Sequence, residues 1–174
     1  MDNLLPIANS LLAASTARWQ QLADMAPPEL WSPRPAPDEW SPHECLHHLV
    51  EVEQLVFPVR LRAFRAGNDF PGFNPETDGR PANLEQTPAA LAAEFSRWRT
   101  NTLALLAELV PADLARTARH GELGPVTLGE FLHEWVAHDL MHLAQGEQAL
   151  MQPFILGCGP WRKSFADYDL TPPA

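Results

Sequence analysis

The sequence predicts an all-α fold, an up-down four-helix bundle with long connecting loops. Four stretches repeat apolar residues at helical spacing, segments rich in proline or glycine separate them, and no series of alternating apolar residues indicates a sheet. A chain of 174 residues fits a single domain over residues 1–174. We expect helices and a packed irregular tail over the following ranges: 3–25, 41–66, 87–110, 127–151 and, for the tail, 152–174.

The first expected helix has apolar residues at helical spacing from Leu4 to Leu22. Six prolines follow it, at positions 27, 28, 33, 35, 37 and 42. Proline lacks a backbone N–H and restricts the residue before it, so this segment cannot continue the helix. We expect a long, stiff connection.

The second expected helix has a strong start, because Ser41 can cap it, Pro42 suits its first turn and Glu44 stands at the capping-box position. We expect Pro58 to kink this helix and Gly67 to end it. Its helical stripe of apolar residues comprises Cys45, Leu49, Val52, Leu55, Val56 and Val59, and the part from Cys45 to Val56 is expected to point inwards.

The third and fourth helices begin at Thr87-Pro88 and at Thr127, which has Glu130 at its capping-box position. Pro111 ends the third helix, a short helical turn is expected at 112–114, and residues 120–125 suit a small turn or hairpin. Trp161, Phe165 and Tyr168 indicate that the tail packs onto the body.

The charge balance argues against two classes of partner. With 12 basic and 22 acidic residues the net charge is −10, which repels phosphate backbones and anionic lipids, so we expect neither nucleic acid nor membrane as a partner. No apolar run reaches the roughly 18–20 residues of a membrane span. The first residues lack the positive start of a signal peptide, and a cytoplasmic location is expected.

The histidines carry the functional signal. His138 and His142 lie four residues apart, so they share one helix face and can converge on a cation. Such a pair alone is not specific, and another helix must supply a further ligand. His48 lies within the inward stripe of the second helix, whereas His47 lies about 100° further round. We therefore expect His48, His138 and His142 to bind one divalent metal; the alternative for His48 is a hydrogen-bonded core histidine.

Three neighbours of these histidines are candidates for supporting roles. Glu134 lies four residues before His138 and is a candidate general base or ligand-orienting group, with a surface role as the alternative. Gln145 follows His142 by three and is expected to orient its ring or a bound water. Cys45 lies one turn before His48 and is a minor candidate ligand or reactive thiol; the alternative is that Cys45 and Cys158 are both reduced structural thiols.

Other histidine patterns are rejected or set aside. His133-Glu134 resembles the start of a zincin motif, but His138 follows five residues after His133 and faces elsewhere. A di-iron site is not favoured, because the first helix contains no Glu. His43, His120 and His133 are expected to be solvated.

Two separated signatures resemble the DinB-like, or YfiT-like, metalloenzyme family. Trp40-Ser41-Pro42 with Glu44 and His48-Leu49 is similar to its second helix, and residues 124–145 are similar to its last helix, with a Thr-Leu start and an HDxxHLxQ ending. The resemblance implies a four-helix bundle with a nickel or zinc site, and its ligands fall on His48, His138 and His142. It also implies thiol-dependent chemistry and a homodimer.

The leading hypothesis is that the metal activates a low-molecular-weight thiol for transfer to an electrophile. The thiol and the electrophile rest on the resemblance alone. Three alternatives stay open: metal-assisted hydrolysis with Glu134 as base, a bundle that binds metal or a small ligand without turnover, and histidines with a purely structural role.

Overall fold

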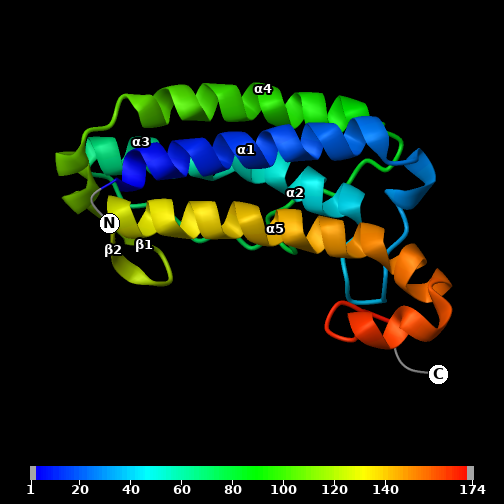
Figure 1. Cartoon of the computed structure of the whole chain (residues 1–174). Helices are drawn as coiled ribbons and strands as arrows, with labels where there is room; N and C mark the ends of the chain where they lie inside the picture. Colours follow the sequence, from blue (N-terminus) through cyan, green and yellow to red (C-terminus); the bar gives the residue numbers. More distant parts are fainter. Residues whose placement is uncertain (1–2, 172–174) are drawn as a thin grey trace.

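The computed structural model describes residues 3–171, which are mostly helical with one small antiparallel sheet (Figure 1). Three short 3-10 helices lie at Pro28–Leu30, Pro111–Ala115 and Gly159–Phe165. The helices and strands are α1 (Leu4–Met25), α2 (Pro42–Leu55), α3 (Phe57–Ala66), α4 (Pro88–Ala107), β1 (Thr117–His120), β2 (Gly124–Thr127) and α5 (Leu128–Gly157). The all-α prediction is therefore correct only in its coarser form, because β1 and β2 add a small sheet where a turn or hairpin was expected.

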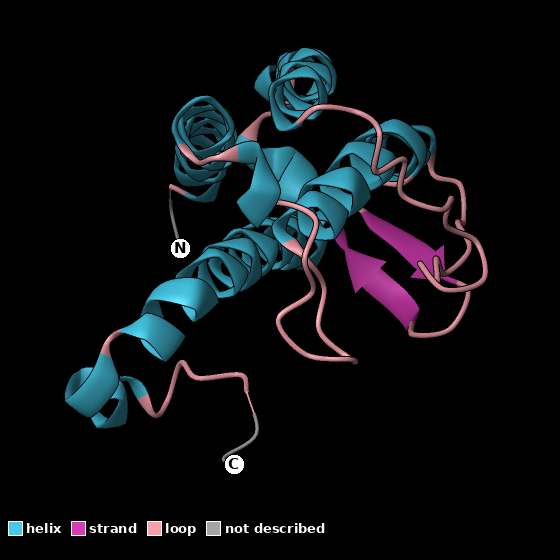
Figure 2. Ribbon diagram, turned by 90° about the vertical axis from the view of Figure 1, so that its right-hand side faces the viewer, coloured by secondary structure: helices cyan, strands magenta, loops and turns pink. Residues whose placement is uncertain are grey.

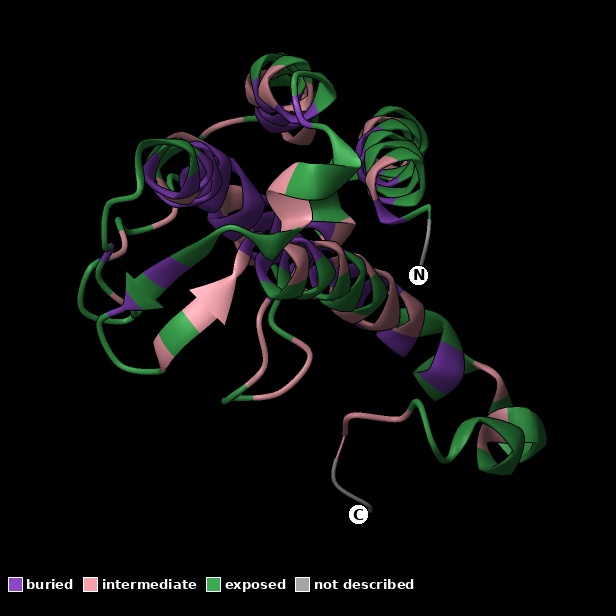
Figure 3. Ribbon diagram, turned by 90° about the vertical axis from the view of Figure 1, so that its left-hand side faces the viewer, coloured by how far each residue is buried: buried purple, intermediate pink, exposed green. Residues whose placement is uncertain are grey.

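The long helices surround a common core. Both α1 and α2 pack against α4 and against α5, and the buried residues lie on the sides of the helices that face one another (Figures 2 and 3). Trp19, Trp31 and Trp135 are among the largest fully buried side chains. Gly146 on α5 allows close packing here, because a Cβ atom at this position would lie 2.3 Å from the Trp19 ring.

The simple up-down order predicted from the sequence is wrong. Gln54 contacts Glu94, and Arg65, which lies further along the chain in α3, contacts Glu108, which follows α4. Residue numbers thus increase in the same direction on both sides, so α2–α3 and α4 run parallel (Figure 1). The 20-residue connection between Gly67 and Gln86 explains this. At about 3.3 Å per residue it can return along the length of α2 and α3 before α4 begins.

The second expected helix is two helices. Pro58 has no N–H to donate to the carbonyl of Gln54, and the chain breaks at Val56 between α2 and α3. The break rotates the faces of the two segments relative to each other. Leu55, expected to point inwards, and Val59, expected in the same apolar stripe, are therefore 46% and 48% exposed.

The last helix continues six residues beyond its expected end and includes Pro153. The expected irregular tail thus begins as helix. Its aromatic residues do not pack inward, since Trp161 is 71% exposed. The tail is instead attached through Gln152, whose side chain donates to the carbonyl of Tyr168 and accepts from the amide of Leu170.

The second, third and fourth expected helices begin at the capping residues predicted from the sequence. Ser41 with Glu44, and Thr127 with Glu130, form complete capping boxes. Thr87 caps α4. Within residues 3–171, no helix combines the length and apolar character needed to cross a membrane.

Candidate metal centre

Three histidines from two helices converge in the core. His48 projects from α2, and His138 and His142 project from successive turns of α5. Their ligand atoms lie within 4.8 Å of one another, and Nε2 of His48 is 3.2 Å from Nε2 of His138. The ring centroids of the three pairs are 4.6–5.2 Å apart. The structure thus brings together the three residues that the spacing predicts.

Aromatic rings enclose this cluster. The indole of Trp40 lies parallel to the ring of His142, with centroids 5.5 Å apart, and meets His48 edge-on at 5.1 Å. Phe57, the first residue of α3, meets His138 edge-on at 5.5 Å. The break that begins α3 therefore also supplies one wall of the site. Trp40 is part of the signature that resembles the DinB-like family, but nothing in the sequence indicates its contact with His142.

Gln145 orients one of the rings. Its Oε1 lies 3.0 Å from Nδ1 of His142, so this ring nitrogen donates and Nε2 keeps its lone pair for a ligand. The Nδ1 atoms of His48 and His138 are buried and have no hydrogen-bond partner within the described residues. The Nε2 atoms of His48 and His138 face each other at 3.2 Å, so Nε2 is the atom that each of these rings would offer to a cation.

The surroundings keep the imidazoles neutral, which is the form that binds a metal. Burial is the main cause that lowers the pKa of His48 and His138 to about 3, and the neighbouring histidines add to this. Burial also lowers the pKa of His142, while the hydrogen bond that its Nδ1 donates to Gln145 opposes the shift. The cluster therefore offers three lone pairs at neutral pH.

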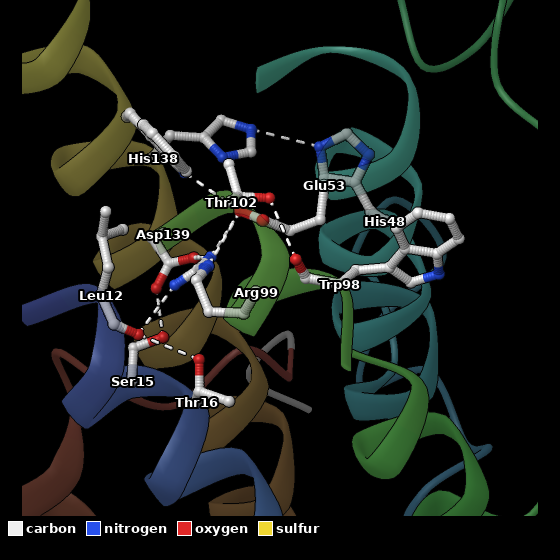
Figure 4. Close-up of polar contacts among 11 residues, drawn as sticks. Leu12, Ser15, Thr16, His48, Glu53, Trp98, Arg99, Thr102, His138 and Asp139 are labelled. Atoms are coloured by element: carbon white, nitrogen blue, oxygen red, sulfur yellow. Dashed lines mark hydrogen bonds and ion pairs between the residues drawn. The ribbon is translucent and has the colours of Figure 1, made fainter. Parts of the chain in front are cut away.

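A buried ionic network joins all the long helices beside the site (Figure 4). Arg99 of α4 donates to Glu53 of α2 at 2.9 Å, to the carbonyl of Leu12 of α1 at 2.8 Å and to Asp139 of α5. Ser15 also donates to Asp139. Asp139 directly follows His138, so the network fixes α5 against α2 where the histidines meet.

Sequence reasoning missed this network. Glu53 lies next to the inward stripe of α2, and Arg99 lies one turn after the buried Phe95 of α4. A signal was therefore present, because charged residues on apolar helix faces need partners. The sequence does not show which helix faces meet, so it does not identify the partners.

Glu134 lies in the cleft that opens onto the histidines. This cleft is lined by residues from α2, α3, the loop before α4, and α5, among them Arg60, Phe73 and Met141. The side chain of Glu134 is exposed, but surrounding protein atoms raise its pKa, and Arg60 opposes this shift. Glu134 is not one of the three clustered ligands.

The candidate role of Cys45 is not supported by its position. Its side chain is fully buried in the hydrophobic core, and burial raises the pKa of its thiol to about 12. It does not belong to the histidine cluster. His47 points away as expected, with its Nε2 3.1 Å from the carbonyl of Arg80.

Two histidines expected in solvent are buried. His43 is enclosed where its Nε2 lies 2.9 Å from the carbonyl of Gln86. His120 lies on β1, bridged to Phe70 of the long connection, so contacts distant in sequence bury it. His133 is exposed, as predicted.

A mostly helical protein with three clustered, neutral histidines from two helices, two of them buried and one half-buried, has features compatible with metal binding. A sequence profile of the DinB superfamily matches residues 11–145, and the chain belongs to this superfamily. The matched range contains all three histidines and Gln145. A comparison with curated proteins gave no match.

Proposed function

We propose that this protein binds one divalent metal ion, nickel or zinc, through His48, His138 and His142, and that it transfers a low-molecular-weight thiol to an electrophile. The convergence of the three neutral imidazoles carries the proposal. Three protein ligands leave a coordination position open, and an ion held in this way lowers the pKa of a bound thiol. The thiol itself is proposed from the family resemblance.

The residues around the cluster support such a reaction. Gln145 holds the His142 ring in one orientation, and Trp40 and Phe57 exclude water from two sides of the cluster. Glu134 in the adjoining cleft is the group that we propose accepts the thiol proton. In a substitution, the thiolate sulfur bonds to the electrophilic carbon as the bond from that carbon to the leaving group breaks, and Glu134 returns the proton to the leaving group. In an addition to a double bond, the displaced π electron pair takes up that proton instead.

Elemental analysis tests metal binding directly. Protein purified without a His-tag or a chelator is expected to contain about one metal ion per chain. His138→Ala and His142→Ala should abolish binding, whereas His133→Ala, an exposed histidine on the same helix, should retain it. Equal metal content in all four proteins would contradict the proposed ligands.

Conjugation assays test the chemistry separately. Metal-loaded protein is expected to accelerate the reaction of at least one small thiol with a model electrophile, and Glu134→Gln is expected to slow it without loss of metal. Metal-loaded protein without any such activity across glutathione, bacillithiol and mycothiol would overturn the transferase proposal. It would leave a protein that binds metal without turnover.

Metal-assisted hydrolysis is the second candidate, because Glu134 lines the same cleft as the histidines. Activity towards esters or amides that disappears in Glu134→Gln, without thiol conjugation, would favour it.

The packing of α1, α2–α3, α4 and α5 supports describing the fold as a four-helix bundle with one long crossover connection.

We also propose a homodimer, which the resemblance implies. Sedimentation equilibrium would test this, and a monomer mass at micromolar concentration would contradict it.

A further inference from the structure

A second recess adjoins the histidine cleft. It has a volume of about 360 Å³ and lies between α3, the hairpin and the start of α5. Arg60, Phe73 and Glu134 line both this recess and the histidine cleft, so the two are neighbours. A ligand in this recess can therefore extend towards the histidines. The thiol reaction proposed above does not use this recess.

Two hydrogen-bond donors face each other in this recess. Nδ1 of His120 accepts from the backbone amides of Glu122, at 3.1 Å, and Leu123, at 3.3 Å, so the ring proton must be on Nε2. This nitrogen lies 3.4 Å from Nη2 of Arg60. A guanidinium has no acceptor, so the two groups cannot satisfy each other. The N–H groups of Arg60 and His120 would both donate to an acceptor placed between them.

Both donors are fixed in position. The Arg60 guanidinium lies over the ring of Phe70 at 5.4 Å, and His120 meets the same ring edge-on at 5.5 Å. None of the ion pairs among residues 3–171 involves Arg60. The protein thus holds a partly buried cation beside a neutral N–H donor and supplies no carboxylate in direct contact.

The remaining lining defines the kind of anion. Phe70, Phe73, Leu123, Val126 and Phe131 provide an apolar surface suited to a hydrocarbon body. Glu122 and Glu134 also line the recess and repel an anion of higher charge. Glu130 is occupied by its cap with Thr127. One carboxylate with an apolar body therefore fits better than a phosphate.

We propose that Arg60 and His120 form a carboxylate-binding subsite for a small monocarboxylate with an apolar body. The carboxylate accepts hydrogen bonds from both donors, and the body lies on the phenylalanine rings towards the histidines. The further assignment of this monocarboxylate as the electrophile rests on the proposed function. Carboxylate binding itself does not.

Phenylacetate is a suitable probe, with 2-phenylethanol as its uncharged analogue and inorganic phosphate as the anion of higher charge. The purified protein is titrated with each of the three compounds, and binding is measured by isothermal calorimetry and by NMR. We expect phenylacetate to bind and the other two compounds not to bind. Arg60→Met should weaken this binding at least tenfold. Arg62→Met, an exposed arginine on the same helix, should leave it unchanged. Circular dichroism and metal content of both variants are expected to match the parent protein.

Three outcomes would overturn the subsite: equal binding of 2-phenylethanol, preferred binding of phosphate, or unchanged affinity in Arg60→Met. Phenylacetate could instead bind a metal at the histidines, so the titration is repeated after chelation. Binding that is lost on chelation but kept in Arg60→Met contradicts the subsite. Binding that persists after chelation supports it, even if the protein proves to have no transferase activity.

Discussion

The Trp40 indole and the His142 imidazole lie stacked, with their planes 11° apart. Trp40 immediately precedes the cap of α2, so a residue at the entry to the helix that carries His48 also covers a candidate ligand of α5. The apolar wall around a metal site controls its access to water and keeps its ligands oriented.

Trp40→Ala is therefore expected to weaken zinc or nickel binding about tenfold. Trp40→Phe retains a stacked ring and should lose less. Isothermal calorimetry measures both, and Trp161→Ala, at an exposed position in the tail, is the matched control. Parent-like affinity in Trp40→Ala would show that the stacking does not contribute.

Arg99→Met is expected to destabilise the protein strongly. It removes the cation and leaves Glu53 and Asp139 buried without their charged partner, which costs about 3–5 kcal/mol. Arg97→Met, on the exposed side of the same helix, should change the free energy of unfolding by less than about 0.5 kcal/mol. Urea unfolding gives both values. A similar, small loss in the two variants would show that the network contributes little to stability.

Gly146→Ala tests a close approach of α1 and α5. Its added methyl group would overlap the Trp19 ring, so either the ring or the helix must shift. We expect a loss of about 1–3 kcal/mol in the free energy of unfolding. Gly157→Ala, at the end of the same helix, meets no atom within 4 Å and should be neutral or slightly stabilising. Thermal or urea unfolding that ranks the two variants in the opposite order would contradict this packing.

The metal-free protein is expected to lose stability as the pH falls from about 7 towards 3. The folded state holds the pKa of His48 and His138 at about 3, below the ordinary value of 6.5. In this window the unfolded chain binds protons that the folded protein does not, and the stability from these groups is complete only above pH 6.5. Each such histidine contributes up to about 1.4 kcal/mol per pH unit.

Because carboxylates also titrate at low pH, the comparison between variants isolates the histidine contribution. His138→Phe should flatten the dependence of unfolding free energy on pH in chelator-treated protein, and His133→Gln should not. Identical slopes in the parent and His138→Phe would contradict the neutral, buried state of His138.

Much of the fold and site followed from local rules. The capping boxes at Ser41 and Thr127 depend on residues three apart, and the pairing of His138 with His142 depends on one helical turn. His48 followed from the phase of the apolar stripe around it. These features need no knowledge of how distant segments meet.

The remaining features depend on contacts between distant segments. The direction of α4 is set by the path of the 67–86 connection, which is long enough to permit either direction. His120 is buried because Phe70 pairs with it, and the partners of Arg99 come from three other helices. The break at Val56 rotates α3 relative to α2, so the apolar residues of the two helices do not form one continuous inward stripe. A periodic pattern that assumes a single helix does not include such a rotation.

The histidines that face each other, His48 and His138, are 90 positions apart in the chain. An ion bound by both would therefore link two helices across more than half of the polypeptide. A nascent chain has only one of the two helices that carry these histidines until α5 leaves the ribosome, so an ion could bind to all three histidines only once the fold is nearly complete. The measured affinity for the metal would then include the free energy of assembling the helices. A bound ion would therefore indicate that folding has finished.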